Sequence, residues 1–290
     1  MVGGNSKYRV FKFKSPYWRP GFDYERFIIS RLRRIVRDGD IVVLSEKAIS
    51  TALGNIIDES KVKPSLTSKL LAGFWMRKIW GYMLGPLCRL KPDTIDKLRK
   101  YPMEEGSKHK EVVLRTSGLI QALKPFSEGS IDVVNLPYSY AALPLKNPDE
   151  LVKRIRRILL KKYGIKVSVV ISDSDKTFSL GPIHLCSRPH CIKGLIGLGP
   201  LAYILGASLG LKARATPVAV AGWPYSMEAL LDVCEIADKA RGYGAGQNIW
   251  EAAARFGTKV TSITWRMLEK IPHYPIVVLR KFEDANQHIF

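Results

Sequence analysis

The stretch Val167–Asp175, VSVVISDSD, is where the interpretation of the chain begins. Its first part, VSVVIS, is rich in β-branched residues, which is typical of a buried strand. Asp173 and Asp175 follow directly. A carboxylate at the end of a buried strand is held firmly and is open on its loop side, which suits a ligand of a hard divalent cation. Aspartate is also an ordinary turn residue, and the stretch taken alone favours a turn.

The elements around this stretch alternate irregularly between helix and strand. A strong amphipathic helix at 148–164, with Leu151, Ile155 and Leu159 on its buried side, leads into the strand. Strands are expected at 8–14, 41–44, 166–172 and 274–281, and helices at 23–40, 69–90, 148–164, 227–242 and 248–257. This order predicts an α+β fold with mixed or antiparallel sheets and packed helices. We expect one catalytic unit over 1–290, with candidate sub-domains 1–165 and 166–290.

The composition indicates a globular protein with a preference for anionic partners. Apolar residues make up 46% of the 290 residues, which excludes a disordered chain. Lys and Arg outnumber Asp and Glu by 46 to 26, and the net charge of +20 favours nucleotides, phosphorylated metabolites, nucleic acid or a membrane surface. Four cysteines are too few for a disulfide framework in a chain of this length. The N-terminal residues contain no apolar signal core, so a cytoplasmic location is expected.

Three segments are considered separately, because their composition bears on whether they lie in the core, at a surface or in a membrane. Residues 194–211 are uncharged and just reach the length of a membrane span, but five glycines and a proline favour a buried core segment, so no transmembrane segment is expected. Residues 69–90 predict an aromatic-rich, basic helix. It is interpreted as a core helix with arginines at its edge, with a membrane surface or a subunit interface as the alternatives. Residues 101–111, YPMEEGSKHKE, are expected to form a charged loop.

Several local motifs point to chemistry without defining it. Lys47 follows the apolar strand at 41–44 and could reach a phosphate, although no Walker loop is present. The glycine pattern at 197–202 lacks a preceding strand and a following acid, so it is not a dinucleotide-binding site. No RNA-binding module signature is found. Four residues have side chains that can ligate zinc, but their spacing matches neither a finger nor a ribbon: His184, Cys186, His190 and Cys191.

Short segments along most of the chain resemble, in the same order, those of the coenzyme F-420-0:L-glutamate ligases, or gamma-glutamyl ligases. DGDIVVLSEKAISTALGN resembles the family's strand followed by Gln-Lys-x-x-Ser-x-x-Glu-Gly, and GSIDVVN resembles Gly-Ile-Asp-x-Ser-Asn. LPLKNPDELVKRIRRIL is similar to the family's Leu-Pro-x-x-Pro and helix, and VSVVISDSD to its strand ending in Ser-Asp-Thr. RPGFDYERFI, CEIADKA and PIVVLRK match further family segments.

The resemblance implies an α+β homodimer that joins L-glutamate to an anionic carboxylate such as that of coenzyme F-420-0. GTP would supply the energy through an acyl phosphate, with Mn²⁺ or Mg²⁺ as the metal, and no stable nucleic acid partner is expected. By this resemblance the metal ligands are Asp132, Asp173 and Ser174, and the nucleotide contacts are Lys47, Ser50 and Asn135. Asp175 then becomes the turn residue. Candidate contacts to the acceptor or to phosphate are Lys108, His109, Lys110 and Lys176.

The sequence also departs from the family pattern. The Gly-Arg-Pro-x-Arg-x-Gly segment expected after the aspartate is replaced by DKTFSLG, in which Lys176 is the only nearby cation. Leu53 stands where the family has a glutamate, and RGYGAGQNIWEAAARFG has no clear counterpart. A divergent paralogue that binds nucleotide and metal, with another substrate or no ligase activity, is therefore one alternative. A basic RNA- or membrane-associated protein is the other, because of the charge surplus.

Overall fold

A mixed β-sheet forms the centre of the protein, whose computed structural model describes residues 7–282. Its strands are β1 (Tyr8–Ser15), β2 (Ile41–Ser45), β5 (Ser168–Leu180), β6 (Ile183–Cys186), β7 (Ile196–Gly197), β8 (Lys212–Ala221) and β9 (His273–Lys281). Within the described residues these seven strands form one sheet in the order β1-β9-β2-β5-β6-β7, with β8 also paired to β5. A separate two-stranded sheet pairs β3 (Ile56–Asp58) with β4 (Tyr140–Ala142).

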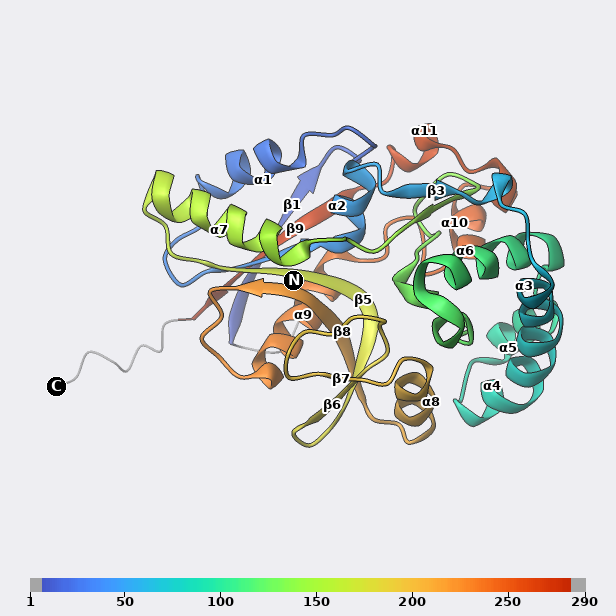
Figure 1. The fold of residues 1–290 in the computed structure, drawn as a ribbon. Helices are drawn as coiled ribbons and strands as arrows, with labels where there is room; N and C mark the ends of the chain where they lie inside the picture. The colour runs from blue at the N-terminus through green and yellow to red at the C-terminus, as the bar shows by residue number, and fades with distance from the viewer. Residues whose placement is uncertain (1–6, 283–290) are drawn as a thin grey trace.

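Helices surround the sheet and build a region of their own on one side of it (Figure 1). Those that pack near the sheet are α1 (Tyr24–Leu32), α2 (Glu46–Ala52), α7 (Pro148–Tyr163), α8 (Pro200–Ser208), α9 (Met227–Arg241), α10 (Ile249–Arg255) and α11 (Trp265–Leu268). Those of the helical region are α3 (Leu66–Leu70), η2 (Leu71–Leu84), α4 (Gly85–Leu87), α5 (Pro92–Arg99) and α6 (Met103–Ala122). Short helical turns are η1 (Glu59–Lys61), η3 (Glu128–Ser130) and η4 (Val260–Ser262).

Strand pairing confirms the predicted α+β class. Strand β2 runs parallel to β5, whereas β9 is antiparallel to both β1 and β2, and β8 is antiparallel to β5. The sheet therefore takes strands from both ends of the chain. The strands expected at 8–14, 41–44 and 274–281 are all present with nearly the same bounds.

Successive side chains of the inner strands pack into two hydrophobic cores, one on each face of the sheet. On β2, Val42 and Leu44 pack with α1 and α7, whereas Ile41 and Val43 pack with α9 on the opposite face. Successive side chains of a strand point to opposite faces, so a continuously apolar strand is one that is covered on both. Figure 1 shows α1 and α7 on one side of the sheet and α9 on the other.

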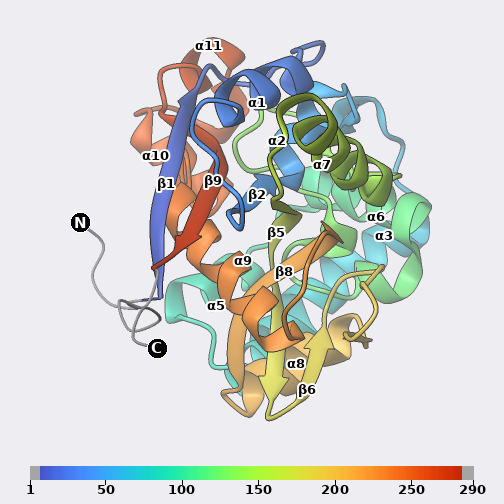
Figure 2. The ribbon, with the colours of Figure 1, turned by 90° about the vertical axis from the view of Figure 1, so that its left-hand side faces the viewer.

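The prediction for residues 101–111, which lie in the helical region between β3 and β4, was wrong. These residues were expected to form a charged loop, but most of them belong to α6. The buried face of the helix combines apolar and charged side chains: Val112 and Val113 pack in a core cluster, and the buried ammonium of Lys110 lies 2.8 Å from Glu128. A buried lysine interrupts the 3.6-residue spacing of apolar residues by which an amphipathic helix is recognised in a sequence. Figure 2 shows α6 beside α3, away from β1 and β9.

The segment 194–211 is also not the buried core segment that its composition predicts. It forms β7 and α8, and α8 buries Pro200, Ala202 and Gly206 but leaves Leu201 and Leu209 about 60% exposed. Small residues let α8 lie close to β5, since a Cβ at Gly206 would overlap the ring of Phe178. Within residues 7–282 no helix is both long and apolar enough to cross a membrane.

Strand β5 corrects the expectation that Asp175 is a turn residue. The strand does not end at the aspartates but continues to Leu180, pairing with β8 on one side and β6 on the other. Its register against β8 shifts between Asp173 and Lys176. Such bulges re-aim side chains and are common beside functional sites. Asp175 is buried, and its carboxylate accepts a hydrogen bond of 3.0 Å from Ser130.

Candidate active site

A cavity of about 420 Å³ lies where β2, β5, α9 and the residues before β9 meet. The segment around Asp132 closes another side of it. Six of the residues that the sequence singles out line this cavity, namely Lys47, Asp132, Asn135, Asp173, Ser174 and Lys176. Segments separated by more than a hundred residues thus place their polar side chains around one space.

Lys47 and Asp132 form an ion pair at the cavity wall. Ser45 caps the start of α2, and Lys47 extends from its first turn to bring Nζ within 2.6 Å of Oδ2 of Asp132. The backbone of Asp132 exchanges two hydrogen bonds with Ala142, and its Oδ1 accepts the N–H of Val134 at 2.8 Å. Because its backbone and one carboxylate oxygen are fixed, Asp132 presents the other oxygen, together with the lysine, to the cavity.

Asp173 lies in the irregular part of β5 and contacts a cation from another loop. Its Oδ2 is paired with the guanidinium of Arg188, and its Oδ1 accepts the N–H of Ser174 at 2.7 Å. Burial raises the pKa of Asp173 well above its usual range, the nearby charge of Asp175 adds to the rise, and Arg188 opposes it. A buried carboxylate with like charges beside it is stabilised in its charged form by any cation placed against it.

Ser174 and Lys176 point toward the end of α9. The Ser174 hydroxyl donates to Oδ1 of Asp238 at 2.8 Å. The Lys176 ammonium lies 3.1 Å from Glu235 and 3.6 Å from Asp238. Both predicted site residues are therefore at the cavity and are already paired with acidic side chains of α9.

Asn135 fixes a glycine-rich loop against the cavity. Its backbone is left-handed, with φ of 58°, and its Oδ1 accepts the N–H of Ala245 at 2.6 Å while its Nδ2 donates to the carbonyl of Tyr243 at 3.2 Å. A Cβ at Gly244 would lie 2.6 Å from the same Oδ1, so the close approach requires glycine. The predicted nucleotide contact thus shapes the loop at 242–247, a segment without family counterpart in the sequence.

Four predicted site residues lie away from this cavity. Ser50 is buried and donates to the carbonyl of Leu143, which ties α2 to the chain after β4. Lys108 pairs with an exposed glutamate, and Lys110 is buried with carbonyl partners at 2.7 and 2.8 Å. His109 lies between Glu59, at 2.7 Å, and a second carboxylate. His109 and Lys110 thus join α6 to Glu59 and Glu128, whereas Lys108 pairs within α6 itself.

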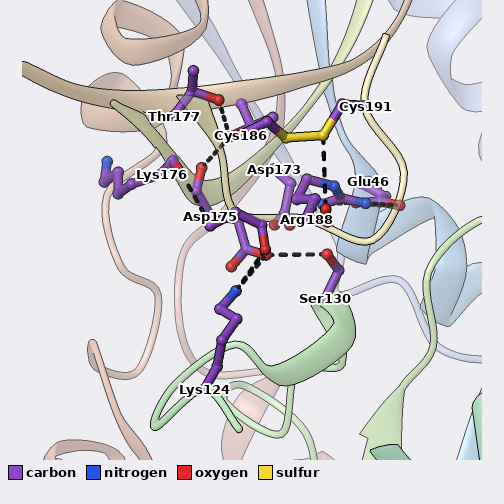
Figure 3. The surroundings of a disulfide bond; sticks show 12 residues. Glu46, Lys124, Ser130, Asp173, Asp175, Lys176, Thr177, Cys186, Arg188 and Cys191 are labelled. Carbon is purple, nitrogen blue, oxygen red and sulfur yellow. Dashed lines mark hydrogen bonds and ion pairs between the residues drawn. A yellow bond between two sulfur atoms is a disulfide. The ribbon is translucent and has the colours of Figure 1, made fainter. Parts of the chain in front are cut away.

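The cysteine and histidine cluster is arranged as a disulfide and not as a zinc site. Cys186 and Cys191 are bonded to each other (Figure 3). His184 is hydrogen-bonded to Ser179 at 2.8 Å. Thiolates are the ligands that zinc would need, and a disulfide removes them. Within residues 7–282 no three His, Cys, Asp or Glu side chains are grouped to hold a metal ion.

The cavity also contains residues that the sequence reasoning missed. Arg241, at the end of α9, donates to the Ser172 hydroxyl at 2.9 Å, and Gln247 lines the cavity beyond the glycine-rich loop. The Nδ1–H of His273 donates to the Pro16 carbonyl, 3.0 Å away. Its pKa is lowered to about 4, chiefly by burial. A glycine-rich segment ending in a polar residue was the available signal for Gln247, whereas nothing local marked Arg241 or His273.

Arg188 supplies a cation beside Asp173 that the sequence pattern does not indicate. The segment DKTFSLG, which begins at Asp175, contains no arginine. The structure shows that this segment is the β5–β6 hairpin, and that an Arg-Pro pair follows it in SRPHC, residues 187–191. The hairpin returns the chain to the aspartates, so Arg188 reaches Asp173 across 15 residues of sequence.

The oxygen ligands at the cavity fit a hard divalent cation bound together with a phosphate. Asp132, Asp173 and Ser174 offer two carboxylates and a hydroxyl from two segments. Mg²⁺ usually takes one or two carboxylates and completes its shell with water and substrate phosphates.

Comparison with known proteins places the chain in a family. Residues 12–221 match the family model described as F420-0:Gamma-glutamyl ligase. The chain belongs to this family. An uncharacterized protein of Methanocaldococcus jannaschii, MJ1361, is 36% identical over 289 residues, covering 95% of this chain and 97% of that protein. The coenzyme F420:L-glutamate ligase of the same organism is 29% identical over 178 residues, 60% of this chain and 63% of that enzyme.

The family match confirms the resemblance, including its divergent character. The cavity residues from Lys47 to Lys176 lie inside the matched range, whereas Arg241 and the loop at 242–247 lie beyond it. Membership in a ligase family makes amide-bond formation the class of reaction to examine first.

Proposed function

We propose that the protein is a GTP- and divalent-metal-dependent ligase that joins the amine of L-glutamate to an anionic carboxylate acceptor of the kind of coenzyme F-420-0. The observation that carries the proposal is the convergence of Lys47, Asp132 and Asp173 on one cavity. These groups match the needs of phosphoryl transfer, which are a cation for phosphate oxygens and carboxylates for a metal. The net charge of +20 suits two anionic substrates.

In this mechanism the acceptor carboxylate oxygen attacks the γ-phosphorus of GTP, and GDP leaves. The glutamate amine then attacks the carbonyl carbon of the acyl phosphate, loses a proton, and expels phosphate to give the amide. Asp132 and Asp173 would hold Mn²⁺ or Mg²⁺, which offsets phosphate charge when bound. When the metal binds Asp132, Lys47 would give up its ion pair with Asp132 and pair with a phosphate oxygen instead. The work of the protein is mostly positioning and charge neutralisation.

Asn135 has an indirect part in this scheme. Its side chain is already bonded to Tyr243 and Ala245, so it would bind nucleotide through the loop that it positions. Ser174 and Lys176, paired to α9, would respond to a ligand by exchanging partners with Asp238. We further propose that the protein acts as a cytoplasmic homodimer, which sedimentation at several concentrations would test.

Titration calorimetry tests the proposal. The protein should bind GTP in the presence of Mn²⁺, and Asp173→Ala should abolish that binding. Asp149→Ala, which removes an exposed carboxylate at the start of α7, is the matched control and should bind like the parent. Failure of both GTP and ATP to bind at millimolar concentration with metal present would rule out the ligase.

A divergent relative with another acceptor is the second candidate. It is favoured by the loop at 242–247, which lines the cavity but lies outside the family match. Such a protein would bind GTP and Mn²⁺ equally well but would form no amide with coenzyme F-420-0. A panel of candidate acids, assayed for GDP release with L-glutamate present, separates the two.

A further inference from the structure

The disulfide between Cys186 and Cys191 closes a small ring of the chain beside the candidate active site. The two cysteines are five residues apart, and their Cα atoms are 6.5 Å apart. The ring lies against β5, because the Ser187 hydroxyl donates to the carbonyl of Lys176 at 3.0 Å. Cys186, Ser187 and Arg188 are all buried. The ring is therefore packed against the same strand that carries Asp173.

Arg188 is the member of the ring that reaches the site. Arg188 is 4% exposed, and its guanidinium binds Glu46 with both terminal nitrogens, at 2.8 and 3.0 Å. The Nη1 nitrogen also pairs with Oδ2 of Asp173 (Figure 3). Paired N–H groups of arginine fix a carboxylate in orientation as well as in charge.

The two carboxylates that Arg188 joins belong to the two sides of the cavity. Glu46 is the first residue of α2 and precedes Lys47, and its Oε1 also accepts the N–H of Leu145 at 3.1 Å. Asp173 lies on β5, and both α2 and β5 contribute residues to the lining of the cavity. One buried guanidinium thus sets the spacing between the element that presents Lys47 and the strand that presents the candidate metal ligand. Among the described residues Asp173 meets no other arginine or lysine within ion-pair distance.

We propose that the ring closed by Cys186–Cys191 is a positioning device for the metal ligand Asp173, in which the disulfide holds Arg188 and Arg188 holds Asp173 and Glu46. The inference rests on the proposed function, since it assigns Arg188 to the metal site of that ligase. Arg188 is a positioning residue that touches neither metal nor substrate. Outer partners of this kind typically change metal affinity about 10- to 100-fold when removed.

The device is sensitive to reduction. A dithiol reductant delivers two electrons to the Cys186–Cys191 bond; its own two thiols become a disulfide, and each cysteine gains a proton. The opened ring, residues 187–190, then lacks its covalent closure and is held by packing, by its hydrogen bonds and by the salt bridges of Arg188. Reduction should therefore weaken metal binding in the same direction as loss of Arg188.

Binding of Mn²⁺ alone, followed by the loss of the free-ion signal in electron paramagnetic resonance, tests the proposal without relying on catalysis. Arg188→Ala should weaken Mn²⁺ binding about 10- to 100-fold, and Arg188→Lys, which keeps the charge but not the fork of two N–H donors, should fall between it and the parent. Lys193→Ala removes an exposed cation just outside the ring and should leave binding unchanged.

The disulfide is tested by a doubly substituted variant and by reduction. Cys186→Ser with Cys191→Ser should weaken Mn²⁺ binding, a dithiol should do the same to the parent, and the dithiol should leave the double variant unaffected. Thermal unfolding of each protein shows whether it is folded at the assay temperature. If Arg188→Ala does not fold, the reduction of the parent still decides the point.

Three results would overturn the inference. Mn²⁺ binding by folded Arg188→Ala within about threefold of the parent would show that Arg188 positions nothing, given the larger effects usual for such partners. Tighter binding would show that Arg188 competes with the cation. Unchanged binding after reduction would remove the disulfide from the device. A parent protein that binds no Mn²⁺, with or without GTP, would instead refute the proposed function itself.

Discussion

His109 lies buried between two carboxylates, and its protonation is expected to stabilise the fold strongly below neutral pH. Its Nδ1 is 2.7 Å from Glu59 and its Nε2 is 3.3 Å from Glu128. Burial lowers the pKa of the imidazole, but the charges of Glu59 and Glu128 outweigh burial and raise the pKa from the ordinary 6.5 to about 10. Glutamine in place of His109 has an amide N–H donor for only one of the two carboxylates, as a neutral imidazole does, and it does not titrate.

The expected effect on stability follows from the two pKa values. Below about pH 6.5 the imidazole is protonated in both the folded and the unfolded chain, and its contribution is complete. Between about pH 6.5 and about pH 10 the unfolded chain loses the proton while the folded one keeps it, so the stability falls as pH rises. A rise of about 3.5 in pKa corresponds to about 5 kcal/mol, at about 1.4 kcal/mol for each unit.

Urea unfolding of the parent and of His109→Gln over this pH range measures the effect. The difference in unfolding free energy should be several kcal/mol near pH 6 and should shrink toward zero near pH 10. Lys108→Gln is the matched control, because its partner Glu104 is exposed and such surface pairs contribute about 0–1 kcal/mol. A difference that is constant with pH, or that grows as pH rises, would refute the assignment of a protonated His109 to this network.

Two further substitutions test the account of the fold. Arg280→Ala leaves the buried carboxylate of Asp40 without the guanidinium 2.7 Å away, so the unfolding free energy should drop by about 3 kcal/mol. Lys14→Ala, on the neighbouring strand, should change it by less than about 0.5 kcal/mol, and equal losses would contradict the role given to Arg280. Gly206→Ala should cost about 1–3 kcal/mol in the same assay, because a Cβ there overlaps the ring of Phe178; an unchanged midpoint would show that α8 can move away from β5.

The central sheet could be predicted from the sequence because its signals are local. The apolar run at 41–44 and the alternating pattern at 8–14 correspond to β2 and β1, and Gly164 ends α7 in the left-handed conformation expected of a helix C-cap. The helix over 103–122 was missed because its buried face carries Lys110, whose partners lie elsewhere in the chain. A buried charge looks like a surface charge until its partners are known.

The residues of the candidate site also fall into those that could be predicted from the sequence and those that could not. Lys47, Asp132 and Asp173 could be proposed because each lies in a short segment with a recognisable family pattern, and the structure brings them to one cavity. Arg188 was missed because a hairpin separates it from Asp173 in the sequence, and Asp175 was misjudged because strand β5 continues through it. Contacts between residues that are distant in the sequence produce no local sequence pattern from which they could be predicted.

The measurement that tests the central claim most directly follows the carboxylate oxygen of the acceptor. The protein is incubated with GTP, Mn²⁺, L-glutamate and coenzyme F-420-0 whose carboxylate carries ¹⁸O, and the released phosphate is analysed by mass spectrometry. Attack of the carboxylate on GTP followed by amide formation predicts one ¹⁸O atom in each phosphate, with an equal amount of GDP and of amide. Amide formed with unlabelled phosphate, or GDP formed without amide, would contradict the acyl phosphate ligase.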